Sequence, residues 1–110
     1  MKLEQLILEA LSKVKASDIL VYDMKEKSPF YDKMILCSVA SERQASAAIN
    51  YIKEEVEKNN YKLRSVEGIN SPWVLIDCYE VIVSIFTKEE REHFALEKVD
   101  MDVPVDKIDK

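Results

Sequence analysis

The sequence predicts one mixed α/β (α+β) domain in which helices flank a sheet of about five strands. Two segments carry apolar residues at helical spacing, and several short apolar runs of strand length lie around them. The chain has 110 residues, of which 47% are hydrophobic, which is enough to bury a single core. The expected order is helix, strand, strand, helix, strand, strand, strand, helix. This order implies a sheet with both parallel and antiparallel pairs.

The first helix and the first two strands are expected within residues 3–39. The helix is predicted by a stripe of six apolar residues: Leu3, Leu6, Ile7, Ala10, Leu11 and Val14. Four consecutive apolar residues within Asp18–Met24 predict a strand that is buried on both sides. A polar loop containing Pro29 then leads to a second strand from about Asp32 to Val39.

The longest helix is expected to begin at Ser41 with a Ser-x-x-Gln capping box. In that motif the Ser41 hydroxyl accepts from the backbone N–H of Gln44, while the Gln44 side chain reaches back. The predicted buried stripe is Ala45, Ala48, Ile49, Ile52 and Val56, and the residues expected to face water are Glu54, Glu55, Glu57 and Lys58. Asn59-Asn60 should end the helix, because Asn tolerates the left-handed conformation.

The remaining elements follow from Tyr61 onward. Tyr61–Val66 is predicted as a short strand, and a turn at Val66-Glu67-Gly68 precedes a β-hairpin over residues 73–86. Thr87 begins a second capping box, which starts a last helix extending through Phe94 and Leu96 to about Val99. Residues 1–99 are therefore expected to form the domain. Residues 100–110 lose periodicity and are expected to be a mobile tail.

The hairpin is the most informative segment, because successive side chains along a strand point to opposite faces of the sheet and so assign each residue to one of two faces. With Tyr79-Glu80 as the loop, Trp73 faces Phe86, Leu75 faces Ser84, and Asp77 faces Ile82. One face is wholly apolar and predicts core: Val74, Ile76, Cys78, Val81, Val83 and Ile85. The opposite face mixes aromatic and aliphatic side chains with a carboxylate and a hydroxyl, which suits a protein-binding surface. The alternative is that helices cover this face too and that Asp77 caps the backbone locally.

Charge and composition narrow the function classes. The net charge of −5 argues against binding nucleic acid through the chain's own field, and favours a basic partner or simply solubility. The first residues are unlike a secretory leader, and no apolar run has the length of a membrane span. Cys37 and Cys78 lie within predicted strands and are expected to be buried free thiols. A cytoplasmic location is therefore expected.

The residues do not favour catalysis. The one histidine, His93, lies in a charged helix and is expected at the surface, and no second histidine exists to build a zinc site. Gly68 is the one glycine, so phosphate-cradling loops are absent. Asp100 and Asp102 have the spacing of a magnesium pair but fall in the expected tail. We expect neither an enzyme nor a cofactor.

Several pieces of sequence occur together in a characteristic order. They are Asp18–Asp23, Lys27-Ser28, Asp32, Ser41–Gln44, Val66-Glu67-Gly68, Trp73–Asp77, Val81–Val83, Arg91 and Leu96-Glu97-Lys98. In this combination the chain resembles the Iojap family of ribosomal silencing factors over nearly its whole length. It departs from the family at Glu26 and Val39, which replace glycines, and at Ser84, which replaces the usual histidine.

The resemblance implies a fold like that of nucleotidyltransferases, without their active-site motifs. It also implies docking onto the large ribosomal subunit through ribosomal protein number fourteen, which sterically prevents joining of the small subunit and represses translation. The implied partner-binding residues are Glu67, Gly68, Trp73, Leu75, Asp77, Ser84 and Phe86.

Within this implied interface each residue has a role. Trp73 would be the aromatic anchor, with Leu75 and Phe86 as apolar flanks. Asp77 and Glu67 would meet Lys or Arg of the partner, Gly68 would allow a sharp turn, and Ser84 would be a weak polar contact. Structural alternatives remain: Trp73 in the core, Glu67 as a solvated turn residue, and Gly68 as purely conformational.

Two other functions remain open from the sequence. One is a residual nucleotidyltransferase-like protein that binds a small nucleotide with magnesium. The other is an adaptor that forms a homodimer through the same hairpin face. Magnesium-dependent nucleotide binding lost on Asp77→Asn would favour the first, and light scattering over a dilution series would reveal the second.

Overall fold

The computed structural model describes residues 2–94 and 105–108. The elements in chain order are α1 (Leu3–Lys13), β1 (Ser17–Asp23), β2 (Lys33–Val39), α2 (Glu42–Lys58), β3 (Ser65–Glu67), β4 (Trp73–Asp77), β5 (Val81–Thr87), α3 (Lys88–Phe94) and β6 (Val105–Ile108). The predicted order of eight elements is confirmed, and β6 is added to it.

The strands form one mixed sheet with the order β3-β4-β5-β2-β1-β6. β2 and β5 pair in parallel, and the other neighbours pair antiparallel. The predicted mixture of parallel and antiparallel pairs is therefore confirmed. The crossover that makes β2 and β5 parallel contains α2, β3 and β4, so the hairpin of β4 and β5 extends the sheet toward one edge.

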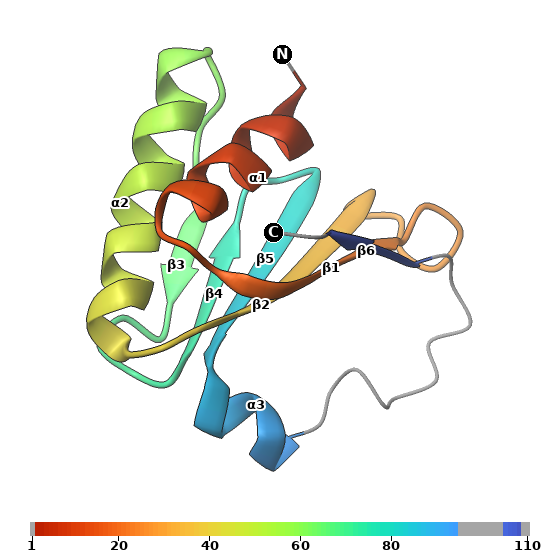
Figure 1. Ribbon diagram of the computed structural model, residues 1–110. Coiled ribbons are helices and arrows are strands. Elements are labelled where there is room, and N and C mark those ends of the chain that lie inside the picture. Colours follow the sequence, from red (N-terminus) through yellow and green to blue (C-terminus); the bar gives the residue numbers. More distant parts are fainter. Residues whose placement is uncertain (1, 95–104, 109–110) are drawn as a thin grey trace.

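The two long helices cover one face of this sheet (Figure 1). Their apolar stripes pack on inward-facing strand residues such as Ile35, Cys37 and Val83 to form the main core. A second, smaller cluster lies on the opposite face, where Leu36 and Phe86 are buried. α3 contacts β2 and β5 on that opposite face. Among the described helices, none is long and apolar enough to cross a bilayer.

The predicted end of the domain is corrected in part. Val105–Ile108 falls in the expected mobile tail but pairs antiparallel with β1, opposite residues Ile19–Tyr22. Ile108 packs against the main core, and the strand covers what would otherwise be an open edge. Four residues are too few for a periodic signal, so this long-range pairing is invisible in the local pattern. The expected helix beyond Phe94 and the remaining tail residues lie outside the described residues.

The third strand is shorter than predicted. Residues 61–64 are not part of it, and β3 covers Ser65–Glu67. Tyr61 instead completes the end of α2: its N–H donates to Val56 and the N–H of Asn60 donates to Glu57, while Asn60 has φ 69°. This is a Schellman-type ending, so the predicted Asn stop is confirmed.

The capping box of α2 is confirmed on its serine side only. The Ser41 hydroxyl accepts from the N–H of Gln44 at 3.2 Å. The Gln44 side chain accepts from the N–H of Ala40, one residue before the expected donor, and donates to the carbonyl of Val14. Gln44 therefore joins the end of α1 to the start of α2, a long-range role that the local motif does not reveal.

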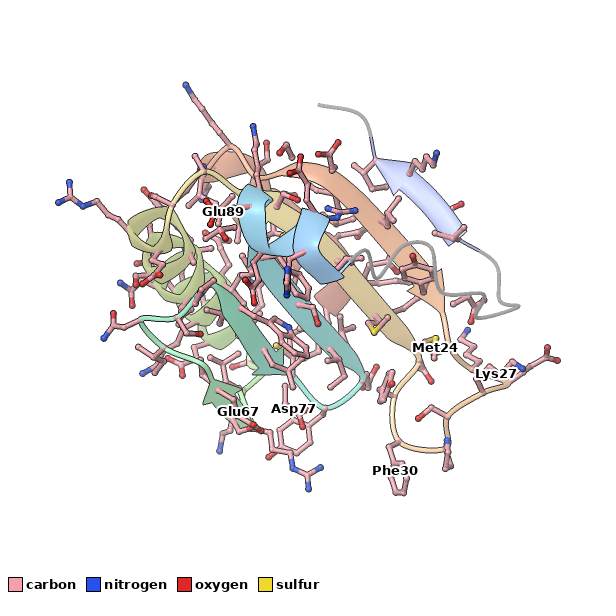
Figure 2. All side chains as sticks on the ribbon, turned by 90° about the horizontal axis from the view of Figure 1, so that it is seen from below. Met24, Lys27, Phe30, Glu67, Asp77 and Glu89 are labelled. Atoms are coloured by element: carbon pink, nitrogen blue, oxygen red, sulfur yellow. The ribbon has the colours of Figure 1, made fainter. Side chains whose placement is uncertain are left out.

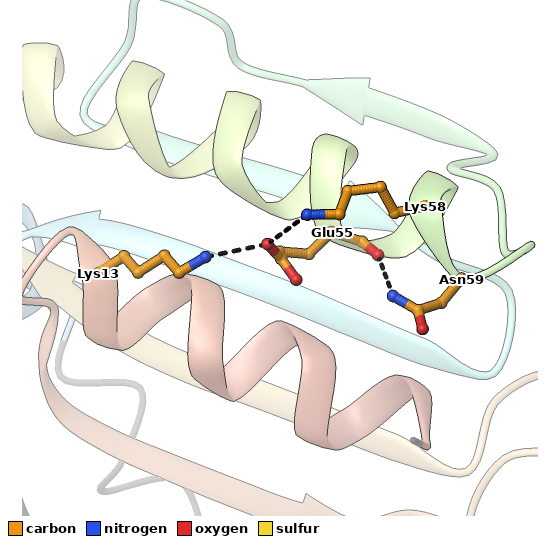
Figure 3. Close-up of polar contacts among 4 residues, drawn as sticks. All are labelled: Lys13, Glu55, Lys58 and Asn59. Carbon is orange, nitrogen blue, oxygen red and sulfur yellow. Dashed lines mark hydrogen bonds and ion pairs between the residues drawn. The ribbon is translucent and has the colours of Figure 1, made fainter.

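Glu55 was expected to face water and is 8% exposed instead. Its carboxylate lies between two lysines, Lys13 on α1 and Lys58 on α2 (Figure 3). The correction has a simple physical reason: α1 packs against α2, and Glu55 lies on the side of α2 that meets it.

Candidate functional site

The hairpin register is the one that the sequence predicts. Trp73 pairs with Phe86, Leu75 with Ser84, and Asp77 with Ile82. The Cys78 N–H donates to Val81 across the Tyr79-Glu80 loop at 2.9 Å. The face predicted to be core is buried throughout: Val74, Ile76, Cys78, Val81, Val83 and Ile85.

The opposite face of the hairpin is open toward the β3 edge. Trp73 is 41% exposed, and Leu75, Asp77 and Ile82 are half-buried. Glu67 on β3 pairs with Leu75 and is exposed, so it shares this face with Asp77, which lies two residues further along the neighbouring strand (Figure 2). We call these five residues, Glu67, Trp73, Leu75, Asp77 and Ile82, the Trp73 face.

Two of the expected contact residues do not lie at the surface. Phe86 is 0% exposed and Ser84 is 5% exposed. Both are on β5, which is an inner strand of the sheet with β4 on one side and β2 on the other. The expectation that Phe86 flanks the anchor at the surface is therefore corrected. Alternation along a strand shows which face a residue lies on, but it does not show which residues of that face are covered by α3 or by another side chain.

Phe86 supports Trp73 instead of flanking it. The two rings are stacked, with their centroids 5.1 Å apart and their planes inclined by 16°. The indole therefore has one side against a buried ring while part of its surface remains exposed. Offset stacking of this kind adds to area burial and orients the ring.

The loop before Trp73 is held by its own hydrogen bonds. Gly68 has φ 80°, and a Cβ at this position would lie 2.1 Å from the carbonyl oxygen of Trp73. The Ser71 N–H donates to Gly68 at 3.0 Å, and the Thr87 N–H donates to Pro72 at 2.9 Å. The conformational interpretation of Gly68 is thus supported, because no other residue fits this approach.

Asp77 has partners within the chain. Its Oδ1 accepts from the N–H of Tyr79 at 2.8 Å, and its Oδ2 lies 4.0 Å from Nε of Arg64. Asp77 therefore caps the backbone locally, as one of the two interpretations of the sequence expects. Its side chain is nevertheless 25% exposed, so the carboxylate is not sealed from solvent.

Three exposed apolar residues near the hairpin did not enter the sequence-based site. Ile69 is 59% exposed at the tip of the loop that precedes Trp73, and Tyr79 is 52% exposed in the hairpin turn. Phe30 is 81% exposed on the loop between β1 and β2 (Figure 2). Gly68-Ile69-Asn70 does carry a turn signal that could have identified Ile69, since two residues of left-handed tendency flank it.

The described residues hold little reactive chemistry. In the ranges 2–94 and 105–108, no three His, Cys, Asp or Glu side chains are grouped so as to hold a metal ion. Cys37 and Cys78 are buried free thiols, as predicted, and burial raises the pKa of each to about 12. Thiols of such high pKa are poor nucleophiles at neutral pH. His93 is exposed on α3. The Asp100 and Asp102 pair lies outside the described residues.

Comparison with known proteins identifies relatives over most of the chain. The family model described as "Ribosomal silencing factor during starvation" matches residues 1–110. A Bacillus subtilis ribosomal silencing factor is 34% identical over 96 residues, covering 86% of this chain and 81% of the relative. The Haemophilus influenzae ribosomal silencing factor is 34% identical over 100 residues, covering 90% and 98% respectively.

Solved structures agree with these sequence matches. The crystal structure of a Bacillus halodurans protein superposes with a TM-score of 0.82 at 31% identity, covering 96% of this chain and 97% of that one. A Chromobacterium violaceum protein gives the same TM-score of 0.82 at 26% identity, with coverage of 88% and 84%.

Proposed function

Since the chain belongs to the family of ribosomal silencing factors, we propose that it binds the large ribosomal subunit and sterically blocks joining of the small subunit. The bound domain occupies space that an intersubunit bridge needs, so translation falls. No bond is made or broken in this mechanism, and no cofactor takes part. The partner on the large subunit is ribosomal protein number fourteen, as the family resemblance implies.

The observation that carries the proposal is the half-exposed indole of Trp73. A large aromatic side chain that is stacked on a buried ring presents apolar area without much loss of side-chain entropy on binding. Leu75 and Ile82 extend the apolar area, and Glu67 lies at its edge. Aromatic centres with a polar rim are typical of protein-binding surfaces.

Charge favours the same kind of partner. The chain has a net charge of −5, and the Trp73 face contains two carboxylates, of which Asp77 has Arg64 4.0 Å away. A basic surface on the partner protein would complement this charge, which would speed encounter and fix orientation. Glu67 is the better candidate for pairing with a basic residue of the partner, because the Asp77 carboxylate already accepts a hydrogen bond within the turn.

The test is sedimentation with separated large and small subunits, followed by a subunit-joining assay. Trp73→Ala should weaken binding to large subunits by about 2–4 kcal/mol, as for a central hot spot, and should restore joining. Tyr51→Ala is a matched control, because Tyr51 is also 41% exposed but lies on α2. A folded Trp73→Ala variant that sediments with large subunits as the wild type does would remove Trp73 from the interface. If the wild-type protein does not sediment with large subunits, the proposed silencing function is refuted.

A further inference from the structure

Arg91 on α3 is a buried cation outside the Trp73 face. The residue is 7% exposed, and its Nη1 donates to the carbonyl of Asp18 at 2.5 Å and to the hydroxyl of Ser38 at 2.9 Å. The two acceptors belong to the start of β1 and the end of β2. Arg91 therefore fastens α3 across two neighbouring strands. Buried charge is expensive unless it is well hydrogen-bonded, so this arrangement is tightly constrained.

The backbone at Asp18 is irregular where it meets Arg91. Asp18 has φ 50°, and the pairing register between β1 and β2 shifts between Ser17 and Leu20. A non-glycine residue in the left-handed region costs free energy, and such positions persist when the surroundings hold them. The hydrogen bond from Arg91 to the Asp18 carbonyl is one of the contacts that keep Asp18 in this conformation.

Ser38, the second acceptor, is in the same row of the sheet as the indole. Ser38 pairs with Phe86 across β2 and β5, and Phe86 pairs with Trp73 across β5 and β4. The three residues share one face, the one that α3 contacts. Arg91, Ser38, Phe86 and Trp73 thus form a continuous series from the buried guanidinium to the exposed ring.

Thr87 connects the same elements through the backbone. Its N–H donates to Pro72, next to Trp73, and its hydroxyl accepts from the N–H of Glu90 at 3.3 Å and so caps α3. A shift of α3 would therefore displace Pro72 as well as Phe86. Two routes, one through side chains and one through Thr87, link the position of α3 to the position of Trp73.

We propose that Arg91 is a positioning residue for the docking surface: by fastening α3 to Asp18 and Ser38 it holds the Phe86 ring, and thereby the Trp73 indole, in the orientation that the partner meets. The inference rests on the proposed function, and it assigns Arg91 no contact with the partner. An anchor held in its bound orientation loses less conformational entropy when it binds. Loosening α3 should therefore weaken docking although the Trp73 face keeps every side chain.

Trp73 is the one tryptophan of the chain, so its spectroscopic signals report this site directly. We compare Arg91→Gln with Lys88→Gln, which removes the same charge from an exposed position of the same helix. Arg91→Gln should reduce the near-ultraviolet circular dichroism of the indole and increase its quenching by acrylamide. It should weaken sedimentation with large subunits by between about twofold and thirtyfold. Lys88→Gln should leave both spectroscopic readouts at wild-type values.

Other results would overturn the inference. Weaker binding by Arg91→Gln with unchanged tryptophan signals would show that Arg91 acts by another route. Altered tryptophan signals with wild-type binding would show that the orientation does not matter for docking. If Arg91→Gln does not fold, Ser38→Ala decides with the same readouts, because it removes only the hydroxyl that accepts from Arg91. If the wild type does not bind large subunits, the proposed function fails, while the spectroscopic comparison still decides whether Arg91 holds the indole.

Discussion

The ammonium nitrogen of Lys13 lies 2.9 Å from Oε1 of Glu55 and so joins the end of α1 to the last turn of α2 (Figure 3). Lys58 lies 3.7 Å from the same oxygen, and the backbone carbonyl of Glu55 accepts from the Asn59 side chain at 2.9 Å. Only 11% of the Glu55 side chain is exposed, against 49% for Lys13. The carboxylate is thus enclosed by the helix pair and compensated by two cations.

This ion pair predicts a pH dependence of stability. The hydrogen bond from Lys13 lowers the pKa of Glu55. The stability that the ionised Glu55 carboxylate adds to the fold is therefore complete above its unfolded-state pKa and is lost as the pH falls through its folded-state pKa. The hydrogen bond to Glu55 raises the pKa of Lys13, so that contribution is complete below the unfolded-state pKa and is lost only in strong base. The pair therefore stabilises the fold throughout the neutral range.

Glu55→Gln should accordingly lower the melting temperature at pH 7, and the deficit should shrink as the pH falls below about 4, where the wild-type carboxylate is also neutralised. Glu57→Gln is the control, because it removes the same charge from an exposed site of the same helix. Thermal unfolding followed by circular dichroism from pH 2 to 8 would measure this. An equal deficit for both variants at every pH would contradict the assignment.

Gln44→Ala should destabilise the domain by about 1.5–3 kcal/mol. The substitution removes the acceptor for the exposed N–H of Ala40 and the donor to the partly buried carbonyl of Val14, and a partly buried group left without a partner costs more than its bond contributes. Urea unfolding would measure the loss. Arg43→Ala, at the exposed neighbouring position, should change stability by no more than about 0.5 kcal/mol. Equal effects of the two substitutions would show that the Gln44 contacts are unimportant.

Local sequence patterns predicted most of this fold but not its long-range polar contacts. The hairpin register, the apolar face and the serine cap at Ser41 all depend on residues close together in the chain, and the structure confirms them. The burial of Glu55 and the second role of Gln44 depend on how α1 meets α2. The residue pattern within one helix does not show how that helix packs against another.

The candidate site shows the same division. Alternation placed Trp73, Leu75 and Asp77 on one face, as observed. It could not show that Phe86 is sealed, because the Trp73 ring stacks on it and α3 contacts β5 on the same face. Alternation could not predict β6 either, because these four residues form a strand only through their pairing with β1, which is distant in the sequence.

Tyr79→Gly should stabilise the fold by about 0.5–1 kcal/mol. Tyr79 has φ 69°, a conformation that costs an L-residue about 1–2 kcal/mol, and the greater freedom of glycine in the unfolded chain offsets part of the gain. The turn bond from its N–H to Asp77 would remain, and the Arg64 guanidinium, 5.9 Å from the ring, would lose a weak contact. Glu80 is not left-handed, so Glu80→Gly gains nothing from the freedom of glycine and should lower the stability of the domain. Urea unfolding measures the stability of both variants. A Tyr79→Gly variant less stable than wild type would mean that the ring contributes more than the strain costs.

Gly68→Ala should destabilise the domain by about 1–3 kcal/mol and disturb Trp73 most of all. The added Cβ would lie 2.1 Å from the carbonyl oxygen of Trp73, and a backbone oxygen cannot move aside without shifting the start of β4. Asn70→Ala in the same loop is the control: Asn70 is also left-handed, with φ 65°, so it shares the conformational cost without that collision. Urea unfolding gives the stability of each variant, and tryptophan emission gives the environment of the indole. The emission should change in Gly68→Ala and stay as in wild type in Asn70→Ala, because only the first variant displaces the backbone that carries the ring. Identical emission in both would show that the loop absorbs the methyl group before it reaches Trp73.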